Sequence, residues 1–278
     1  KGLLEELNGK LGVIRPTFEE YPNRWEKDVI AYDCTENDFS YTASQLIQYF
    51  TENPVDTLVL INPDNPTGHC MNADEIKRLL QWSRQCDINL IIDESFLDFA
   101  DAENLSLLSE QVLKENKNLY VVKSISKSYG VPGIRLGILA SGNTDMIGRL
   151  KKDVSIWNIN SMAEFFMQIL DKYKSDYTDS LRKIKEERSR FLNELCAIKN
   201  LKVYPSQANY FMCEILDGIS SEELAGRLLK ENILIKDLTG KIHNGKQYIR
   251  IAIRGEEENR ILVEKLRLCM GQRENVEQ

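Results

Sequence analysis

One lysine in this chain is surrounded by the residue types that covalent cofactor chemistry needs. Lys127 has serines one and three residues before it, and Arg135 follows eight residues after it. Glycines and a proline between them indicate a loop, and the apolar residues 119–122 predict a buried strand leading into it. Open α/β sheets bind ligands at the carboxyl ends of such strands. The lysine could form a Schiff base with an aldehyde cofactor whose phosphate the hydroxyls and the arginine hold, or it could be a solvated lysine in a polar loop.

Two further strands are predicted to end in polar residues that can share a crevice with Lys127. The apolar residues 58–60 lead into Ile-Asn-Pro-Asp-Asn-Pro-Thr-Gly at 61–68, and the apolar run from residue 89 ends at Asp93. These two segments, followed by Ser-x-Ser-Lys with an arginine eight residues on, resemble the class I/II, fold-type I pyridoxal-phosphate aminotransferases. Within that family the chain is most similar to the branch of histidinol-phosphate aminotransferase and threonine-phosphate decarboxylase. The resemblance extends over nearly the whole chain.

The resemblance implies an α/β fold of fold type I. We expect a mostly parallel sheet with helices on both faces and a small carboxyl-terminal α/β domain. Residues 1–165 are expected to form the large cofactor-binding domain, and residues 166–278 a connecting helix and the small domain. Because the chain opens directly on a helical pattern, we also expect that the amino-terminal part of the large domain, with its phosphate-binding loop, is missing. The resemblance further implies a homodimer.

Hydrophobic periodicity and capping residues predict the elements around these motifs. Asn72 with Glu75, and Ser220 with Glu223, are patterns typical of helix starts. The expected strands outside the motifs cover residues 12–15, 136–140, 209–215, 233–236 and 247–254. The other expected helices cover residues 41–50, 105–114, 161–199 as two helices or one kinked helix, and 257–270.

The resemblance assigns roles around the pyridoxal phosphate to residues at the strand ends. Lys127 would hold the cofactor as a Schiff base and move the proton at the substrate Cα, and Asp93 would pair with the protonated ring nitrogen. Asn65 would bond the ring oxygen O3′. The expected phosphate ligands are Ser124, Ser126 and Arg135.

Further site residues are expected on the two sides of the cofactor. Phe18 either stacks on the cofactor ring or belongs to the core. Phe96 occupies the position of a tyrosine that donates to O3′ in aminotransferases, and in this it is similar to the threonine-phosphate decarboxylases. Arg250 is expected to bind the substrate carboxylate, whereas Arg254 is expected in a surface salt bridge. Asn209 either lines the substrate pocket or begins a core strand.

Composition excludes several other classes of function. With 36 basic and 43 acidic residues the net charge is −7, which argues against nucleic acid or an anionic membrane as a partner. The chain has only two histidines and no Cys-x-x-Cys pair, so we expect no metal site. Its six scattered cysteines predict free buried thiols in a reducing cytoplasm. No apolar run reaches the length of a membrane helix.

We therefore expect a cytoplasmic enzyme that uses pyridoxal phosphate. The first expectation is an aminotransferase that moves an amino group between an L-amino acid, or a phosphorylated amino alcohol, and a 2-oxo acid. The second is a decarboxylase of a phosphorylated amino acid, which the phenylalanine at position 96 favours. The third is a non-catalytic domain that has kept the fold. The identity of the substrate side chain is not specified by the sequence.

Overall fold

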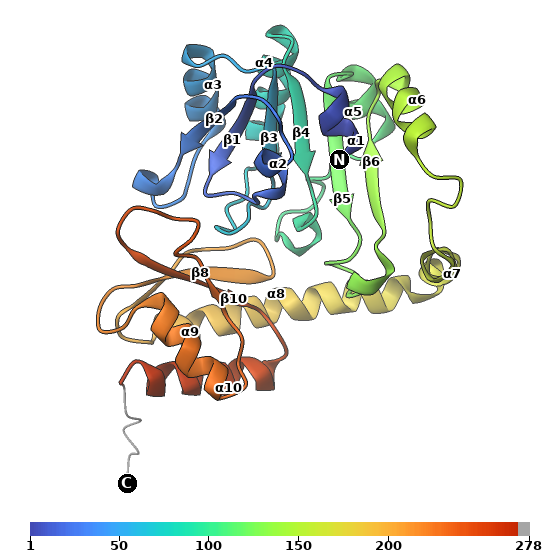
Figure 1. Cartoon of the computed structure of the whole chain (residues 1–278). Helices are drawn as coiled ribbons and strands as arrows, with labels where there is room; N and C mark the ends of the chain where they lie inside the picture. The colour runs from blue at the N-terminus through green and yellow to red at the C-terminus, as the bar shows by residue number, and fades with distance from the viewer. Residues whose placement is uncertain (272–278) are drawn as a thin grey trace.

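Two β-sheets form the framework of the structure, a computed structural model that describes residues 1–271 (Figure 1). The sheets have the strand orders β2-β1-β3-β4-β5-β6 and β7-β8-β10-β9. The strands of the larger sheet are β1 (Leu11–Arg15), β2 (Val29–Asp33), β3 (Thr57–Ile61), β4 (Asn89–Asp93), β5 (Leu119–Ser124) and β6 (Gly137–Ala140). Those of the smaller sheet are β7 (Leu201–Val203), β8 (Tyr210–Ile215), β9 (Lys236–Asp237) and β10 (Gln247–Ala252). The larger sheet is parallel except for the β5–β6 pair, which confirms the expected architecture.

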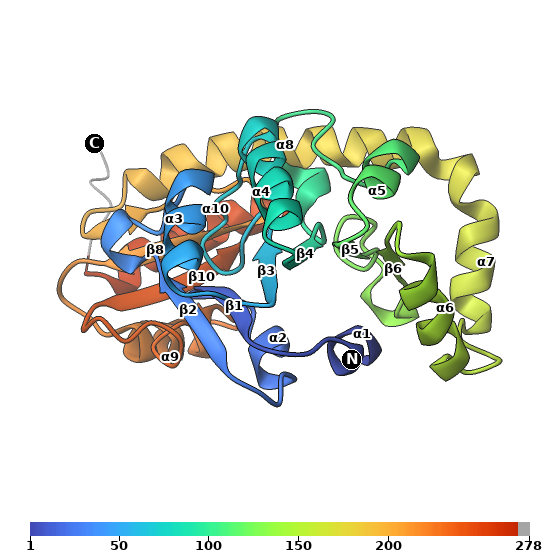
Figure 2. The same cartoon turned by 90° about the horizontal axis from the view of Figure 1, so that it is seen from above.

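Helices cover both faces of the larger sheet (Figure 2). On one face lie α3 (Ala43–Glu52), α4 (Ala73–Gln85) and α5 (Glu110–Glu115). On the other face lie α1 (Gly2–Glu6), α2 (Glu20–Asn23) and α6 (Thr144–Asp153). The strands explain this arrangement, because successive side chains of a strand point to opposite faces. In β3, Leu58 and Leu60 are buried in one core, whereas Val59 and Ile61 are buried in the other.

The register of the parallel strands brings their carboxyl ends to one edge. Asp93 at the end of β4 pairs with Ile61 of β3 on one side and with Val122 of β5 on the other. The same edge faces the smaller sheet (Figure 1). Residues that follow β3, β4 and β5 therefore meet between the two sheets, as expected for an open α/β sheet.

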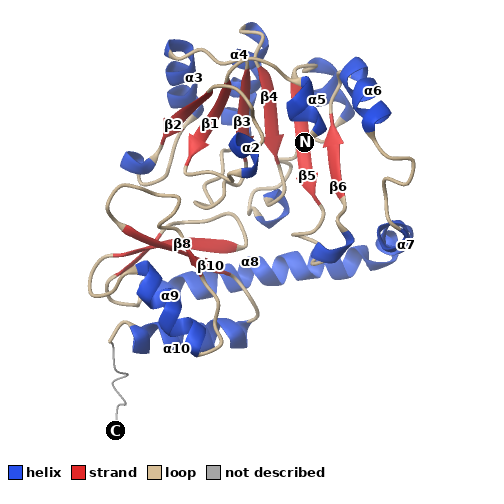
Figure 3. Ribbon diagram, viewed as in Figure 1, coloured by secondary structure: helices blue, strands red, loops and turns tan. Residues whose placement is uncertain are grey.

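A long helix joins the two sheets. After α7 (Ser161–Ile169) and a short 3₁₀ turn, α8 (Lys174–Cys196) runs beneath the larger sheet to the smaller one (Figure 1). The expected helical region is thus two helices. The smaller sheet is antiparallel and is covered by α9 (Ser221–Lys230) and α10 (Glu256–Cys269), with a core of its own (Figure 3).

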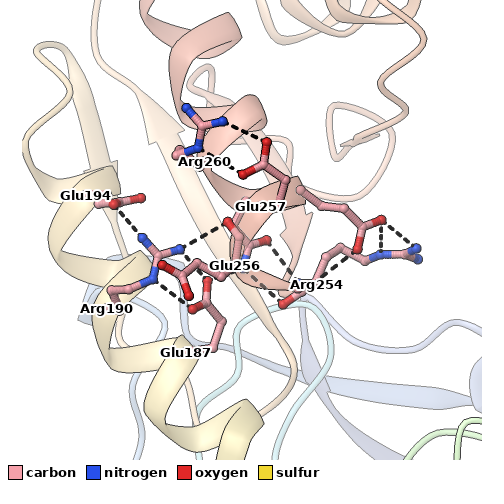
Figure 4. A network of polar contacts seen from close by, with 10 residues as sticks. Glu187, Arg190, Glu194, Arg254, Glu256, Glu257 and Arg260 are labelled. Carbon is pink, nitrogen blue, oxygen red and sulfur yellow. Dashed lines mark hydrogen bonds and ion pairs between the residues drawn. The ribbon is translucent and has the colours of Figure 1, made fainter.

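Charged side chains fasten α10 to α8. Glu187 of α8 accepts hydrogen bonds of 2.6 Å from Arg190 and from Asn259, the latter a fully buried residue of α10. Arg190 also reaches Glu194 and the carbonyl of Glu256 (Figure 4). Because α10 follows β10 directly, this network fixes the smaller sheet against the connecting helix.

Several predicted elements have other limits in the structure. The helix expected over residues 105–114 begins only at Glu110, because buried Glu94 holds the preceding loop by accepting bonds of 2.6 Å from Ser106 Oγ and Leu107 N. The strand expected at 233–236 is reduced to β9. The strands β2 and β7 and the helix α6 were not predicted. Capping at Asn72 and Ser220 is confirmed.

Candidate functional site between the two sheets

The end of β4 holds a carboxylate in a fixed orientation. Asp93 is 7% exposed and borders a cavity of about 990 Å³ at the edge of the larger sheet. Its Oδ2 accepts a hydrogen bond of 2.7 Å from the Tyr21 hydroxyl, and its Oδ1 accepts one of 2.9 Å from the Ser95 amide. The Tyr21 phenol stays protonated, because burial and the neighbouring carboxylate both raise its pKa. A buried carboxylate with two neutral donors can still bind a cation.

The loop after β5 brings the lysine to the same cavity. Lys127 Nζ lies 5.7 Å from the centroid of the Phe96 ring, and both residues border the cavity. Ser124 anchors the start of the loop, since its amide donates to Ser95 Oγ at 2.9 Å. The buried hydroxyl of Ser126 has no hydrogen-bond partner within residues 1–271. The structure thus brings the predicted lysine and hydroxyls together.

The predicted arginine lies at the rim of this cavity. Arg135 is exposed and donates to the Pro132 carbonyl at 3.0 Å. Its backbone has a φ of 54°, a left-handed conformation that is uncommon for residues other than glycine. The short 3₁₀ turn of residues Pro132–Ile134 precedes it and directs the chain back into β6.

Asn65 and Arg250 connect the larger sheet to the smaller one. Asn65, 7% exposed, follows β3, and its Oδ1 accepts a hydrogen bond of 2.6 Å from Arg250 of β10. The Arg250 guanidinium also lies 4.9 Å from the ring centroid of Tyr210. Tyr210 in turn packs edge-on against Phe96, with the ring centroids 5.1 Å apart. The residues predicted for the cofactor and for the substrate are therefore in direct contact.

A second cavity of about 360 Å³ lies on the side of the smaller sheet. It shares Phe18 and Lys127 with the first cavity, and Asn209 borders it, as expected for a pocket residue. Phe18 is 40% exposed, so the alternative of a core aromatic is wrong. The cations around the second cavity are Lys127, Lys236, Lys241 and Arg250.

Arg254 does not take part in this site. Its guanidinium bonds Glu258 Oε1 at 2.8 Å and its side chain is 66% exposed (Figure 4). The expectation of a surface salt bridge is thereby confirmed. The six cysteines are free, although Cys86 and Cys196 are exposed rather than buried. Within residues 1–271 the structure has no metal-binding group of His, Cys, Asp and Glu side chains, nor a helix long and apolar enough to span a membrane.

Comparison with known proteins identifies the family. The sequence model of the family described as "Aminotransferase class I and II" matches residues 13–266. The chain belongs to this family. It is 33% identical to a CMP-5'-(3-aminopropyl)phosphonate synthase of Streptomyces rubellomurinus, over 97% of this chain and 43% of that protein. It is also 33% identical to an L-serine phosphate decarboxylase of Campylobacter jejuni, over 96% of this chain and 70% of that protein.

The fold comparison agrees with the sequence comparison. The histidinol-phosphate aminotransferase structure of Clostridium acetobutylicum superposes with a TM-score of 0.87 at 28% identity, covering 97% of this chain and 80% of that one. Proteins named threonine-phosphate decarboxylase also match, so the expected branch of the class I and II aminotransferases is confirmed. Since members of this family depend on pyridoxal 5'-phosphate, that cofactor belongs to this family member as well.

The residues of this aminotransferase-family chain fit the cofactor. A phosphate near Ser126 would give its buried, unpartnered hydroxyl an acceptor, and Ser124 and Arg135 border the same cavity. Asp93 presents a carboxylate for a ring N–H, and Asn65 presents an amide for a ring oxygen. Lys127 borders the same cavity. These side chains therefore match the three parts of pyridoxal phosphate, namely the amine-reactive aldehyde, the basic ring and the phosphate.

Sequence reasoning missed two residues of the site. Tyr21, which holds Asp93, lies in the short helix α2, three residues after Phe18, and this spacing was the available signal. Lys241 donates to the Thr17 carbonyl at 2.9 Å, although 224 positions separate the two residues. Burial lowers the pKa of Lys241. Nothing in the local sequence around Lys241 indicates this contact.

Proposed function

We propose that this protein is a pyridoxal-phosphate-dependent decarboxylase of an O-phosphorylated amino acid. The observation that carries the proposal is the charge of the second cavity. Apart from Lys127, three cations border a space of about 360 Å³ in a chain whose net charge is −7. One carboxylate would balance one of them. A substrate that also carries a phosphate would supply the remaining negative charge.

Each of the proposed roles follows from a position in the site. Arg250 would form a bidentate pair with the substrate carboxylate while Asn65 orients its guanidinium. Lys236 and Lys241 would face the phosphate. Lys127 would bind the cofactor and later deliver a proton to the substrate Cα, with Asp93 holding the ring nitrogen in its protonated form. The bound cofactor supplies an electron sink for the bond broken at Cα.

We place decarboxylation before amino transfer, which reverses the order expected from the sequence. The relatives at 33% identity support this order, because one of them is named an L-serine phosphate decarboxylase. Phe96 supports it as well. It stands where aminotransferases have a tyrosine that donates to the cofactor, and a phenylalanine cannot donate a hydrogen bond. Phe96 instead presents a ring to Lys127 and to Tyr210.

Product analysis tests this proposal. The holoprotein is incubated with O-phospho-L-serine, O-phospho-L-threonine, or the unphosphorylated amino acids, and carbon dioxide and the amine product are measured. We expect both products from a phosphorylated amino acid only, and neither product with Lys127→Ala. Equal rates with phosphorylated and unphosphorylated amino acids, or no carbon dioxide from any of them, would contradict the proposal.

Amino transfer is the second candidate, and the TM-score of 0.87 with a histidinol-phosphate aminotransferase favours it. The two reactions differ in their need for a 2-oxo acid. An aminotransferase converts 2-oxoglutarate to glutamate in step with consumption of the amino donor. A decarboxylase releases carbon dioxide at a rate that 2-oxoglutarate does not change.

We also propose that the chain has domains at 1–165 and 166–278.

We further propose that the protein is a homodimer. Large apolar side chains are exposed on α7 and before it, with Ile156 at 95%, Trp157 at 89% and Met162 at 70%. Exposed apolar groups of this size are typical of contact surfaces between proteins. Light scattering should give twice the mass of one chain, and Trp157→Asp should reduce it to one chain. A single-chain mass for the unaltered protein would refute the dimer.

A further inference from the structure

The loop that carries Lys127 has weak internal support. Its backbone bonds from Tyr129 to Ile125 and from Gly130 to Lys127 are long, at 3.4 Å and 3.3 Å. Gly130 has a φ of +64°, and a Cβ at this position would meet no other atom within 4 Å. A loop of this kind keeps one conformation only if other elements hold it.

The helices α7 and α8 support this loop. The ring of Tyr129 in the loop stacks on the ring of Tyr177 in α8, with centroids 4.0 Å apart and an angle of 3° between the planes. Phe166 of α7 packs edge-on against the same ring, with centroids 6.0 Å apart. Figure 1 shows the loop after β5 reaching down to the amino-terminal half of α8. Stacked and edge-on aromatic pairs add to the stability of the contact between the loop and the two helices.

A buried polar cluster lies at the same contact. The hydroxyls of Tyr177 and Ser128 and the Oδ2 of Asp98 are buried and have no hydrogen-bond partner within residues 1–271. Ser128 and Asp98 are nonetheless close enough to influence the pKa of the Tyr177 phenol, which burial raises. The other oxygen of Asp98 accepts a bond of 2.6 Å from Lys123 of β5. Three such groups can satisfy one another through a small shift or through one shared water.

This cluster is separate from the cofactor cavity. Ser128 directly follows Lys127, yet Ser128, Tyr177 and Asp98 border neither of the two cavities. The cluster therefore contacts the lysine loop outside the two cavities. It connects to the lining of the first cavity through Lys127, which precedes Ser128, and through Lys123, which bonds Asp98.

We propose that Tyr177 is a positioning residue for Lys127. By stacking on Tyr129 and approaching Ser128, it holds the two residues that follow the lysine and so aims the amine at the cofactor aldehyde. The Lys127 amine would condense with that aldehyde, with the release of one water. The proposal rests on cofactor binding, which the family establishes, and is independent of the bond that is broken in the substrate.

Two forms of the cofactor separate positioning from simple stability. Pyridoxamine 5'-phosphate has the same ring and phosphate as pyridoxal 5'-phosphate but carries an amine in place of the aldehyde, so it cannot condense with Lys127. We expect Tyr177→Ala to weaken pyridoxal phosphate binding by about fivefold to tenfold, the scale of one lost aromatic pair. The same variant should weaken pyridoxamine phosphate binding by less than about twofold, because that ligand does not use the lysine. Both affinities are measured by calorimetry on the apoprotein.

Two further variants complete the experiment. Tyr177→Phe keeps the stack and loses the hydroxyl, so it should give a smaller change in the same direction, about twofold. Thr178→Ala removes an exposed hydroxyl from the next position of α8 and should change neither affinity. Equal weakening of both ligands by Tyr177→Ala would mean a purely structural role and would overturn the proposal. If Tyr177→Ala does not fold, an unchanged affinity ratio in Tyr177→Phe overturns it instead.

Discussion

The two walls of the site are built in different ways. The wall from the larger sheet has one polar residue at or just beyond the carboxyl end of each of three neighbouring parallel strands, namely Asn65, Asp93 and Ser124. The wall from the smaller sheet presents cations, of which Lys236 and Arg250 lie on antiparallel strands. The first wall is fixed by the register of one sheet. The second is positioned by contacts between residues that are far apart in the chain.

Few bonds join these walls. Arg250 donates to Asn65, Tyr210 donates to the Asp64 carbonyl at 2.6 Å, and Lys241 donates to the Thr17 carbonyl. The sheet-built wall therefore suits the common cofactor, whose shape does not change between relatives. The cationic wall suits the substrate, since its side chains can be replaced without disturbing the larger sheet. This division predicts which substitutions remove the reaction and which change only its substrate.

The largest effect is expected on the sheet-built wall. Lys127→Ala removes both the amine that binds the cofactor and the proton carrier, so kcat should fall by at least about a thousandfold. The exposed Lys151 of α6 offers a control, and Lys151→Ala should leave kcat unchanged. The measurement is the rate of product formation with saturating cofactor. A residual kcat above about one tenth of that of the unaltered protein would show that another group binds the cofactor and carries the proton.

Arg250 and Arg254 give a matched test of the cationic wall. Arg250→Ala leaves a substrate carboxylate without its partner, so kcat/KM should fall by about a hundredfold, mostly through KM. Arg254→Ala removes only a surface pair with Glu258 and should change kcat/KM by less than about twofold. Steady-state kinetics with a phosphorylated amino acid as substrate give kcat and KM for each variant. Similar losses in both variants would refute the assignment of the two arginines.

The difference between the walls also explains what could be predicted from the sequence. Asn65, Asp93 and Lys127 were predictable, because each follows a short apolar run and parallel strands end together at one edge. The capping residue Asn72 was equally visible. These features depend on neighbours in the chain.

The features that were missed depend on distant neighbours. Lys241 reaches the site only after the smaller sheet has folded and packed against the loop at Thr17. Glu94 determines where α5 begins by holding Leu107, 13 residues away. The strand β2 was missed although residues 29–32 form an apolar run, and it lies half buried at the edge of the larger sheet. Long-range contacts of this kind leave no local pattern in the sequence.

Tyr21 tests how far the sheet-built wall depends on support from outside the sheet. Tyr21→Phe keeps the ring but removes the donor to Asp93 Oδ2, a hydrogen bond to a charged group. We expect kcat to fall by about tenfold, the scale of one such bond, with little change in KM. Tyr32→Phe is the control, since within residues 1–271 the Tyr32 hydroxyl accepts a bond from Asn37 alone and Tyr32 borders neither cavity. Equal rates for Tyr21→Phe and the unaltered protein would mean that the sheet alone orients Asp93.

The smallest effect concerns Asp64, at the junction of the two walls. Asp64 is 1% exposed, its carboxyl group accepts a bond of 2.8 Å from the Thr67 hydroxyl, and burial raises its pKa to about 7. Because the folded state binds this proton more tightly than the unfolded chain does, the free energy of unfolding should decrease as the pH rises from 5 towards 8.

The variant Asp64→Asn isolates this contribution, since an amide keeps an acceptor for Thr67 and has no charge. Urea unfolding at pH 5 and pH 8 measures this difference. Over this range the free energy of unfolding of the unaltered protein should decrease by on the order of 2 kcal/mol more than that of the variant. Activity should change little, because Asp64 borders neither cavity. The same pH dependence in both proteins would mean that another group titrates over this range and that the buried carboxyl group of Asp64 does not.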